Sequence, residues 1–260
     1  MDKRIAHYKK TIHKWITNRS DGILVVAGGK NDRDVFKELG FKNVTISNID
    51  ERLNGNDFLP YKWSCQDVEN LSFEDSSFDF VVIHATLHHC RSPHRALLEM
   101  YRVAKRGIIM FESRDSFIMR ILIYFGLTES HEHVNVYYHS CKRGEMRNTD
   151  IPNFVYRWTE REIEKTIGSY APFAPHRFRY SYSHDSPCTP DRIKKGVIKT
   201  LFVNLMKPCY YLFSKIFPKQ QNLFACFIEK PGIEKDHYKW LKYRDGKLTF
   251  DEEWAGNYYR

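Results

Sequence analysis

The sequence predicts an α/β protein built on a doubly wound, mostly parallel sheet of seven strands, with helices on both faces and an inserted helical and loop cap. The main observation is that short apolar runs alternate with segments of helical periodicity over residues 22–114. Such an alternation is typical of parallel strands joined by right-handed crossovers. A second observation is the apolar run at 23–27, too short for a helix, which leads through Gly28 and Gly29 into a helical segment. This order of strand, glycine turn and helix occurs at the ligand-binding edge of doubly wound sheets.

The first half of the chain is expected to supply five strands, at 23–27, 44–46, 62–65, 78–84 and 107–111. Before them, residues 2–18 predict a helix at the sheet edge, because its apolar residues fall on one helical stripe. Asn31 or Asp32 is expected to cap the helix after the glycines, and Gly40 to end it. Ser92 and Pro93 are a typical start for a helix over 93–104.

The second half is less regular. An apolar helix is expected over 115–127, and residues 128–156 show no clear period. Thr159 and Glu162 form a capping box that predicts a helix to about residue 169. Thr189 and Pro190 predict the start of a long helix that ends at Pro208. Strands are expected at 173–182 and 222–229, and a hairpin at 241–244 and 247–250.

The composition gives hints about partners and compartment. The net charge of +9 and the pI of about 9.1 favour anionic partners. The six cysteines include no CxxC pair and no secretory signal precedes them, so we expect reduced thiols in a cytoplasmic protein. Residues 197–218 are apolar enough to suggest peripheral contact with the inner face of a membrane, although Lys199, Lys207 and Lys215 argue against a span. The favoured alternative for this segment is a helix and cap that pack on the core.

Several motifs occur in a specific order along the chain. They are the glycine turn at 27–31, Asp50 after the second strand, Gln66-Asp67-Val68-Glu69 with Leu71 and Phe73, residues 78–82 running into Leu87-His88-His89, and residues 98–103. In this combination the chain resembles the class I S-adenosylmethionine-dependent methyltransferases, in particular the broad group called methyltransferase type 11. The resemblance is specific from Gly22 to Glu112 and weak from there to Glu229.

The resemblance implies a Rossmann-like fold and S-adenosylmethionine as the cofactor. It further implies one methyltransferase domain over 1–230, with 20–114 as the cofactor-binding half. In this division, 115–158 and 190–218 are insertions on the substrate side, and 231–260 is a C-terminal extension that contains the hairpin.

The resemblance also implies roles for individual residues. It places Asp50 on the ribose hydroxyls, as its spacing from the glycines also suggests. Asp67 would accept from the adenine amino group, and His84 would face the sulfonium. A capping or turn-forming role is the alternative for Asp50 and Asp67. The complete set of expected cofactor-binding residues is Ala27, Gly28, Gly29, Asp50, Asp67, Val68 and His84.

The glycine turn departs from the family pattern. Val25 stands where the family usually has an acidic residue, and Ala27 where it has the first glycine. Alanine suits that position if its φ is negative, and Asn31 tolerates left-handed geometry. Lys30 is expected either near the cofactor carboxylate or in water. This departure motivates an alternative function, a non-catalytic binding or scaffold protein that retains the fold.

Methyl transfer to a hydroxyl requires close placement of the acceptor and removal of a proton. The candidate catalytic residues are His88, His89 and Arg114. Either histidine is a natural base or a wall of the pocket. Arg114 is expected either to orient an anionic substrate or to pair with Glu112 or Asp115.

No metal ion is expected from the sequence. His84 and His88 are four residues apart, and His131, His133, His139 and Cys141 form a loose group. Zinc sites can have such spacings, but neither a carboxylate ligand nor a pattern of supporting residues is evident.

The expected reaction is O-methylation of a sugar-containing or other small polar acceptor, including phosphorylated ones. The aromatic and basic character of 115–158 and 190–218 motivates this expectation, together with a general likeness to enzymes of bacterial surface-polysaccharide pathways. RNA methylation is the alternative substrate class. Nucleic acid is a less favoured partner, because no RNA-recognition, helix-turn-helix or zinc-finger pattern occurs.

Overall fold

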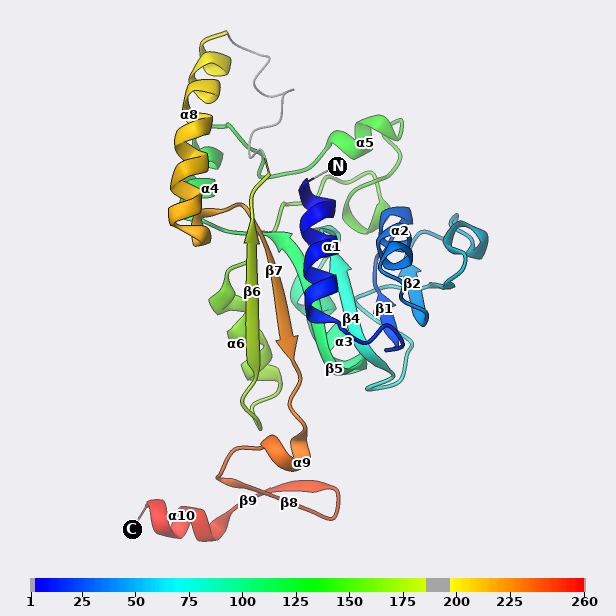
Figure 1. The fold of residues 1–260 in the computed structure, drawn as a ribbon, viewed down its shortest axis with the longest axis vertical. Helices are drawn as coiled ribbons and strands as arrows, with labels where there is room; N and C mark the ends of the chain where they lie inside the picture. Colours follow the sequence, from blue (N-terminus) through cyan, green and yellow to red (C-terminus); the bar gives the residue numbers. More distant parts are fainter. Residues whose placement is uncertain (1–2, 186–196, 260) are drawn as a thin grey trace.

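The computed structural model describes residues 3–185 and 197–259 (Figure 1). Its main sheet has seven strands in the order β3-β2-β1-β4-β5-β7-β6, and β7 runs antiparallel to both of its neighbours. The predicted α/β fold with a mostly parallel sheet is therefore confirmed. The strands are β1 (Ile23–Val25), β2 (Val44–Asn48), β3 (Lys62–Cys65), β4 (Phe78–His84), β5 (Ala104–Ser113), β6 (Arg177–Ser183) and β7 (Leu223–Glu229).

Helices cover both faces of this sheet and enclose two apolar cores. One core packs α1 (Lys3–Trp15) and α2 (Lys30–Glu38) against side chains of the central strands, such as Val82 and Phe111. The other packs α3 (Pro93–Val103) and α6 (Glu160–Tyr170) against the opposite face, where Ile83 lies. Alternate residues of β4 thus point into different cores, because successive side chains of a strand point to opposite faces.

The first helix was expected at the edge of the sheet, but it lies on one face of the sheet. Tyr8 of α1 is completely buried and its ring contacts Phe36 of α2 and Phe111 of β5. The apolar stripe of α1 is wide enough to cover the central strands, so the helix buries it there.

Helix starts follow the predicted caps in two of three cases. The Ser92 hydroxyl accepts from the Arg95 N–H at the start of α3, and the Thr159 hydroxyl accepts from the Glu162 N–H at the start of α6. The prediction for α2 was wrong. Gly29 is the cap, and Asp32 instead accepts the Gly29 N–H at 2.8 Å from inside the first turn.

Two further helices, α4 (Phe117–Tyr124) and α8 (Val197–Ile216), lie side by side beyond the end of the sheet (Figure 1). Val203 of α8 packs against Leu122 of α4. The expected end of the long helix at Pro208 was wrong, because proline removes one backbone hydrogen bond but its fixed φ is compatible with a helix. Its expected start at Thr189 and Pro190 lies outside the described residues.

The remaining elements are short. They are η1 (Gly55–Phe58), η2 (Leu87–His89), α5 (Val134–Tyr138), η3 (Met146–Asn148), η4 (Pro218–Gln220), α9 (Ile233–Asp236), the hairpin β8 (Leu241–Arg244) and β9 (Lys247–Phe250), and α10 (Glu252–Tyr258). The hairpin has the predicted boundaries. Among the described residues, no helix combines the length and apolar character that crossing a bilayer requires.

Candidate active site

A cavity of about 400 Å³ lies at the carboxyl end of the parallel strands. Its walls come from the residues that follow β1, β2, β3 and β4 and from the segment 135–148. Five of the residues predicted from the sequence line it, namely Ala27, Asp50, Asp67, Val68 and His89. The volume lies within the range of small-molecule sites, roughly 300–1,000 Å³.

The chain turns sharply at the floor of this cavity. Ala27 has φ of +50°, so the condition under which we expected alanine to replace glycine, a negative φ, is not met. Gly28 has a packing reason to be glycine, because an added Cβ would lie 2.8 Å from a methyl of Ile46 and 2.9 Å from one of Val25. Lys30 is not among the residues that line the cavity, and its Nζ pairs with Asp57 at 2.9 Å.

Asp50 lies beyond β2, where a ribose-binding carboxylate was expected. It is oriented by its own turn, since it accepts the backbone N–H of Arg52 at 3.1 Å and the Arg52 Nε–H at 2.7 Å. The side-chain hydrogen bond from Arg52 lowers the pKa of Asp50, so this acceptor is ionised at neutral pH. Asn148, which also lines the cavity, contributes to lowering the pKa of Asp50.

Asp67 forms a turn at the wall of the cavity. Its Oδ1 accepts the Glu69 N–H at 2.9 Å and so forms a turn, while the residue lines the cavity beside Val68. Arg147 lies over this turn, 2.8 Å from Asp67 Oδ2 and 3.1 Å from Glu69 Oε2. The sequence did not reveal Arg147, because the segment 128–156 has no periodicity that would place its side chains.

A second cavity, of about 190 Å³, lies at the same edge of the sheet. His84 lines this cavity and not the first one, which differs from its expected place beside the cofactor. His84 shares a face of β4 with Val82, and its ring stacks on that of Tyr8 with centroids 4.3 Å apart. Ala85, with φ of +54°, then turns the chain so that the following residues reach the first cavity.

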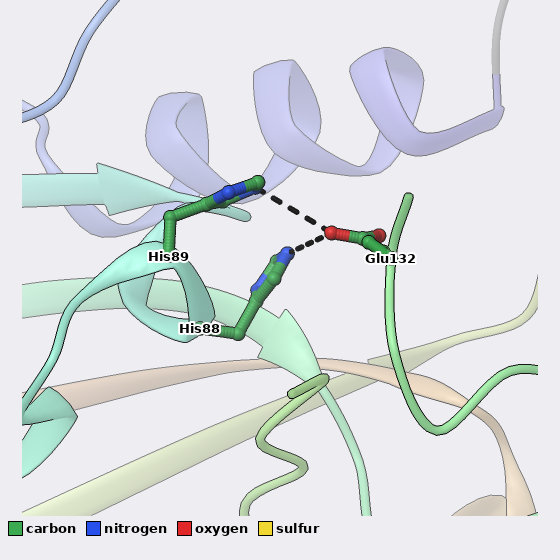
Figure 2. A group of neighbouring side chains, drawn as sticks. All are labelled: His88, His89 and Glu132. Atoms are coloured by element: carbon green, nitrogen blue, oxygen red, sulfur yellow. Dashed lines mark ion pairs between the residues drawn. The ribbon is translucent and has the colours of Figure 1, made fainter. Parts of the chain in front are cut away.

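His89 and Asn135 line both cavities. Beside them, His88 is buried, with Nδ1 2.9 Å from Glu112 Oε2 and Nε2 3.2 Å from Glu132 Oε2. His89 Nε2 lies 3.6 Å from the same oxygen of Glu132 (Figure 2). The two predicted histidines thus converge on a carboxylate that the sequence did not suggest.

The charges of this group follow from its burial and its neighbours. Burial opposes the protonation of His88, but Glu112 and Glu132 outweigh it and raise its pKa to about 10. Burial and the neighbouring His88 lower the pKa of His89. Burial favours the neutral form of Glu132, but the two histidines lower its pKa to about 2.

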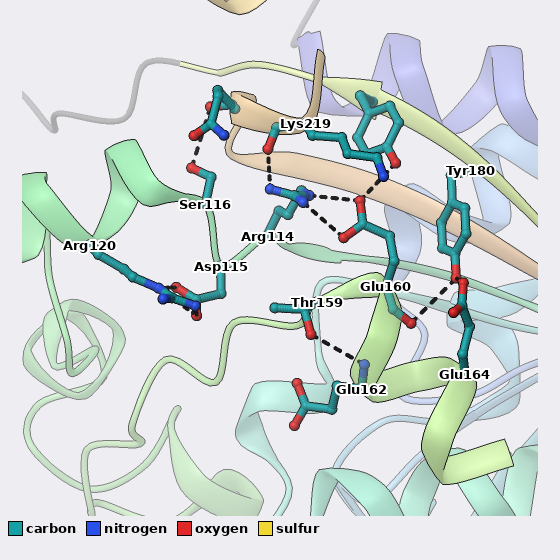
Figure 3. A network of polar contacts seen from close by, with 12 residues as sticks. Arg114, Asp115, Ser116, Arg120, Thr159, Glu160, Glu162, Glu164, Tyr180 and Lys219 are labelled. Atoms are coloured by element: carbon teal, nitrogen blue, oxygen red, sulfur yellow. Dashed lines mark hydrogen bonds and ion pairs between the residues drawn. The ribbon is translucent and has the colours of Figure 1, made fainter. Parts of the chain in front are cut away.

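Arg114 lies outside both cavities. Its guanidinium forms two parallel hydrogen bonds with Glu160, at 3.0 and 2.8 Å, and donates a third to the carbonyl of Lys219 (Figure 3). The partner is therefore neither Glu112 nor Asp115, the two carboxylates we had considered. These contacts tie β5 to α6 and η4, so the expected role of Arg114 in catalysis has no support from its position.

The fold has counterparts among solved structures. The PH0226 protein from Pyrococcus horikoshii matches with a TM-score of 0.52 at 13% identity, over 88% of this chain and 90% of that one. The YcgJ protein from Bacillus subtilis matches with a TM-score of 0.51 at 12% identity, over 88% and 99%. Magnesium protoporphyrin IX methyltransferase from Synechocystis, a structure with bound S-adenosylhomocysteine, matches with a TM-score of 0.50 at 13% identity, over 88% and 86%.

The sheet order and the cavity at its carboxyl edge define a protein of the class I methyltransferase fold. Residues 35–111 match the sequence family described as "Methyltransferase domain". This family match, together with the shared fold, supports a methyltransferase that uses S-adenosylmethionine as its cofactor.

Proposed function

We propose that this enzyme methylates a hydroxyl of a small polar, sugar-containing acceptor. The observation that supports this most directly is the pair of cavities that share His89 and Asn135. The larger one lies at the sheet edge where a cofactor was expected, and four of the seven expected cofactor residues line it, namely Ala27, Asp50, Asp67 and Val68, whereas Gly28, Gly29 and His84 do not. The smaller one is lined by four histidines and two glutamates, among them His7, His84 and Glu132, beside apolar residues such as Phe111. Imidazoles and carboxylates are suitable partners for hydroxyl groups.

In the larger cavity, the residues fit the cofactor. Asp50 is ionised and held in one orientation, and a carboxylate accepts both hydroxyls of a ribose diol. Val68 offers an apolar surface to the adenine, and Asp67 an acceptor to its amino group. Ala27 places the backbone turn at the methionine end. The bound cofactor supplies an electrophilic methyl group on a positively charged sulfur.

In the smaller cavity, the chain must hold the acceptor and remove its proton. Asn135 and His89 lie at the junction, where they can orient a hydroxyl toward the larger cavity. The group of His88, His89 and Glu132 lies at the same junction, and we assign the removal of the hydroxyl proton to it.

The cofactor part of this proposal is tested by calorimetric titration of S-adenosylmethionine into wild-type protein and two variants. Asp50→Ala removes the ribose carboxylate, and Glu51→Ala removes an exposed carboxylate one residue away. Hydrogen bonds to a charged group contribute about 1.5–3 kcal/mol, so Asp50→Ala is expected to weaken binding by roughly 10- to 100-fold. Equal affinities of the two variants would refute the assignment of Asp50, and no binding by wild-type protein would favour a non-catalytic scaffold.

The acceptor class is tested by transfer of a tritiated methyl group from the cofactor. Cell-envelope glycans and total RNA are offered in separate reactions. The tritium label in each product is then measured, with base-labile and acid-labile products counted separately. We expect label in the glycan fraction. Label in RNA alone would replace the proposed acceptor with the alternative considered from the sequence.

A peripheral membrane contact is also proposed, through an apolar surface on α4 and α8. Leu201, Leu205, Leu212 and Ile216 of α8 are each more than 60% exposed, as are Phe117, Tyr124 and Phe125 in and after α4. The charged residues of the described part of α8 are lysines, and Lys207 and Lys215 are exposed. An apolar surface with cations suits an anionic bilayer.

This contact is tested by sedimentation with vesicles of phosphatidylcholine and phosphatidylglycerol. Leu205→Glu and Leu212→Glu together are expected to release the protein from the vesicles. Glu252→Leu in α10, remote from this surface, is the control. Equal sedimentation of wild type and the double variant would refute a contact through this surface.

A further inference from the structure

Two histidines and a glutamate converge at the junction of the two cavities. His88, His89 and Glu132 each offer one atom to a group in which all atoms lie within 4.8 Å of one another. The two measured separations to Glu132 Oε2 are 3.2 Å from His88 Nε2 and 3.6 Å from His89 Nε2. Two ligands about 2.1 Å from one tetrahedral ion lie about 3.4 Å apart, so these separations match those of ligands that share a metal ion.

The other nitrogen of each imidazole faces its own carboxylate. His88 Nδ1 lies 2.9 Å from Glu112 Oε2, and His89 Nδ1 lies 3.4 Å from Glu145 Oε2. The remaining oxygen of Glu112 accepts the backbone N–H groups of Thr86 and Leu87. Histidines that bind metals usually donate their other N–H to a carboxylate in this way, which fixes the ring and the tautomer.

Glu145 gives an independent indication. Its side chain is completely buried, and its Oε2 has no hydrogen-bond partner among the described residues. A buried, unpartnered carboxylate oxygen is costly. If His89 binds an ion through Nε2, its proton resides on Nδ1 and is directed toward Glu145, which removes this cost.

The same contacts without a metal would be less well satisfied. A neutral imidazole carries one N–H, so one of the two carboxylates beside His89 would face a lone pair of the ring. In addition, three buried or half-buried carboxylates surround two imidazoles. A divalent cation offsets this excess of negative charge.

We propose that His88, His89 and Glu132 bind a divalent transition-metal ion, with Glu112 and Glu145 as the carboxylates that orient the two imidazoles. Two histidines and one glutamate are a known ligand set for zinc, and the related two-histidine, one-carboxylate set binds iron(II) with open positions. The remaining coordination positions face the cavities, because His88, His89 and Glu132 all line the smaller one.

The consequence for catalysis rests on the proposed transfer to a hydroxyl. With the ion bound, the three side chains act on the hydroxyl proton through the metal and not as free bases. An acceptor hydroxyl bound to the ion has a lowered pKa and loses its proton to water in the open cavity. The oxygen then forms a bond to the methyl carbon, while the carbon–sulfur bond breaks and its electron pair remains on sulfur. The ion would also fix the acceptor next to the larger cavity.

Metal binding is tested directly, without cofactor or acceptor. Chelator-treated protein is titrated with zinc chloride in a calorimeter and with cobalt(II) in a spectrophotometer. Wild-type protein is expected to bind one equivalent of each ion, with cobalt absorption bands in the visible range. Glu132→Gln is expected to lower the zinc affinity at least tenfold, whereas Glu129→Gln, three residues away and outside the group, is expected to leave it unchanged.

A second pair of variants protects the test against misfolding. His89→Gln removes another ligand, and Glu145→Gln changes only an orienting carboxylate, for which a loss of roughly 10- to 100-fold is typical. Circular dichroism establishes that each variant is folded. The absence of stoichiometric binding by wild-type protein, or equal losses in Glu132→Gln and Glu129→Gln, would overturn the proposal. Because no methyl acceptor is used, this result is independent of whether the proposed methyl transfer is correct.

Discussion

Replacement of Gly28 by alanine is expected to destabilise the protein, and the structure allows the size of the effect to be worked out. The new Cβ would lie 2.8 Å from Cγ2 of Ile46 and 2.9 Å from Cγ1 of Val25. Favourable contacts between carbons occur at about 3.5–4.0 Å, so each distance is short by roughly 0.6 Å or more. Both neighbours are completely buried, and β-branched side chains have little rotational freedom.

Extra methyl groups in a packed core typically cost about 1–3 kcal/mol. Alanine also reduces the freedom of the unfolded chain, which returns about 0.4–1 kcal/mol. We therefore expect a net loss of roughly 1.5 kcal/mol in the free energy of unfolding from these two effects. With a urea dependence of about 3 kcal/mol per molar, the unfolding midpoint would fall by roughly 0.5 M.

Gly29→Ala is the matched control, one residue further along the same turn. Its added Cβ would have Asp32 Oδ2 as its nearest neighbour, at 4.0 Å, which is an ordinary contact distance. We expect its urea midpoint to lie close to that of wild type. Alanine is less favourable than glycine at a helix N-cap, but it also lowers the conformational entropy of the unfolded chain, and the two effects offset each other. Equal midpoints for Gly28→Ala and wild type, or equal losses in both variants, would refute the argument from packing.

Three further predictions concern other parts of the chain. Ala27→Gly is expected to raise the free energy of unfolding by about 0.5–1 kcal/mol in urea unfolding, because φ of +50° strains alanine more than glycine; a loss would contradict this. Arg114→Lys is expected to lower the free energy of unfolding by about 2–3 kcal/mol, because lysine cannot replace both hydrogen bonds to Glu160. The Michaelis constants of the folded enzyme should stay unchanged. A raised Michaelis constant for the methyl acceptor would instead indicate that Arg114 contacts the substrate. Burial lowers the pKa of His7 to about 4, whereas the unfolded chain binds this proton near 6.5. The contribution of His7 to stability should therefore be full well above pH 6.5 and fall by ~3 kcal/mol as the pH drops to 4, and His7→Asn should flatten this slope in urea unfolding between pH 4 and 7.

The strands, most helices and the hairpin could be predicted because their signals are local. A capping pair such as Thr159 and Glu162, or the turn at Asp245 and Gly246, acts over a few residues and needs no distant partner. The errors arose where a local signal left alternatives open. Pro208 is compatible with a helix that continues beyond it. The apolar stripe of α1 shows that the helix packs on the sheet but does not specify which part of the sheet it covers.

The candidate site was predictable only at the ends of the parallel strands. Asp50, Asp67, Val68 and His89 follow β2, β3 and β4, and the topology brings these ends together at one edge. His84 also ends a strand, but the alternation of side chains directs it to the face of α1 and into the smaller cavity. The direction of a side chain at a strand end depends on register and on the next backbone turn, which the motif alone does not specify.

The sequence by itself determined the fold class and the edge of the sheet at which the larger cavity lies, because periodicity and motif spacing are properties of short segments. The tertiary structure alone decided which side chains complete the site. Glu132, Glu145 and Arg147 belong to a segment without a repeating pattern. The packing of that segment over the sheet places the two glutamates beside His88 and His89, and Arg147 beside Asp67 and Glu69. Contacts between residues far apart in the chain depend on the closure of the whole fold, so no local pattern in the sequence encodes them.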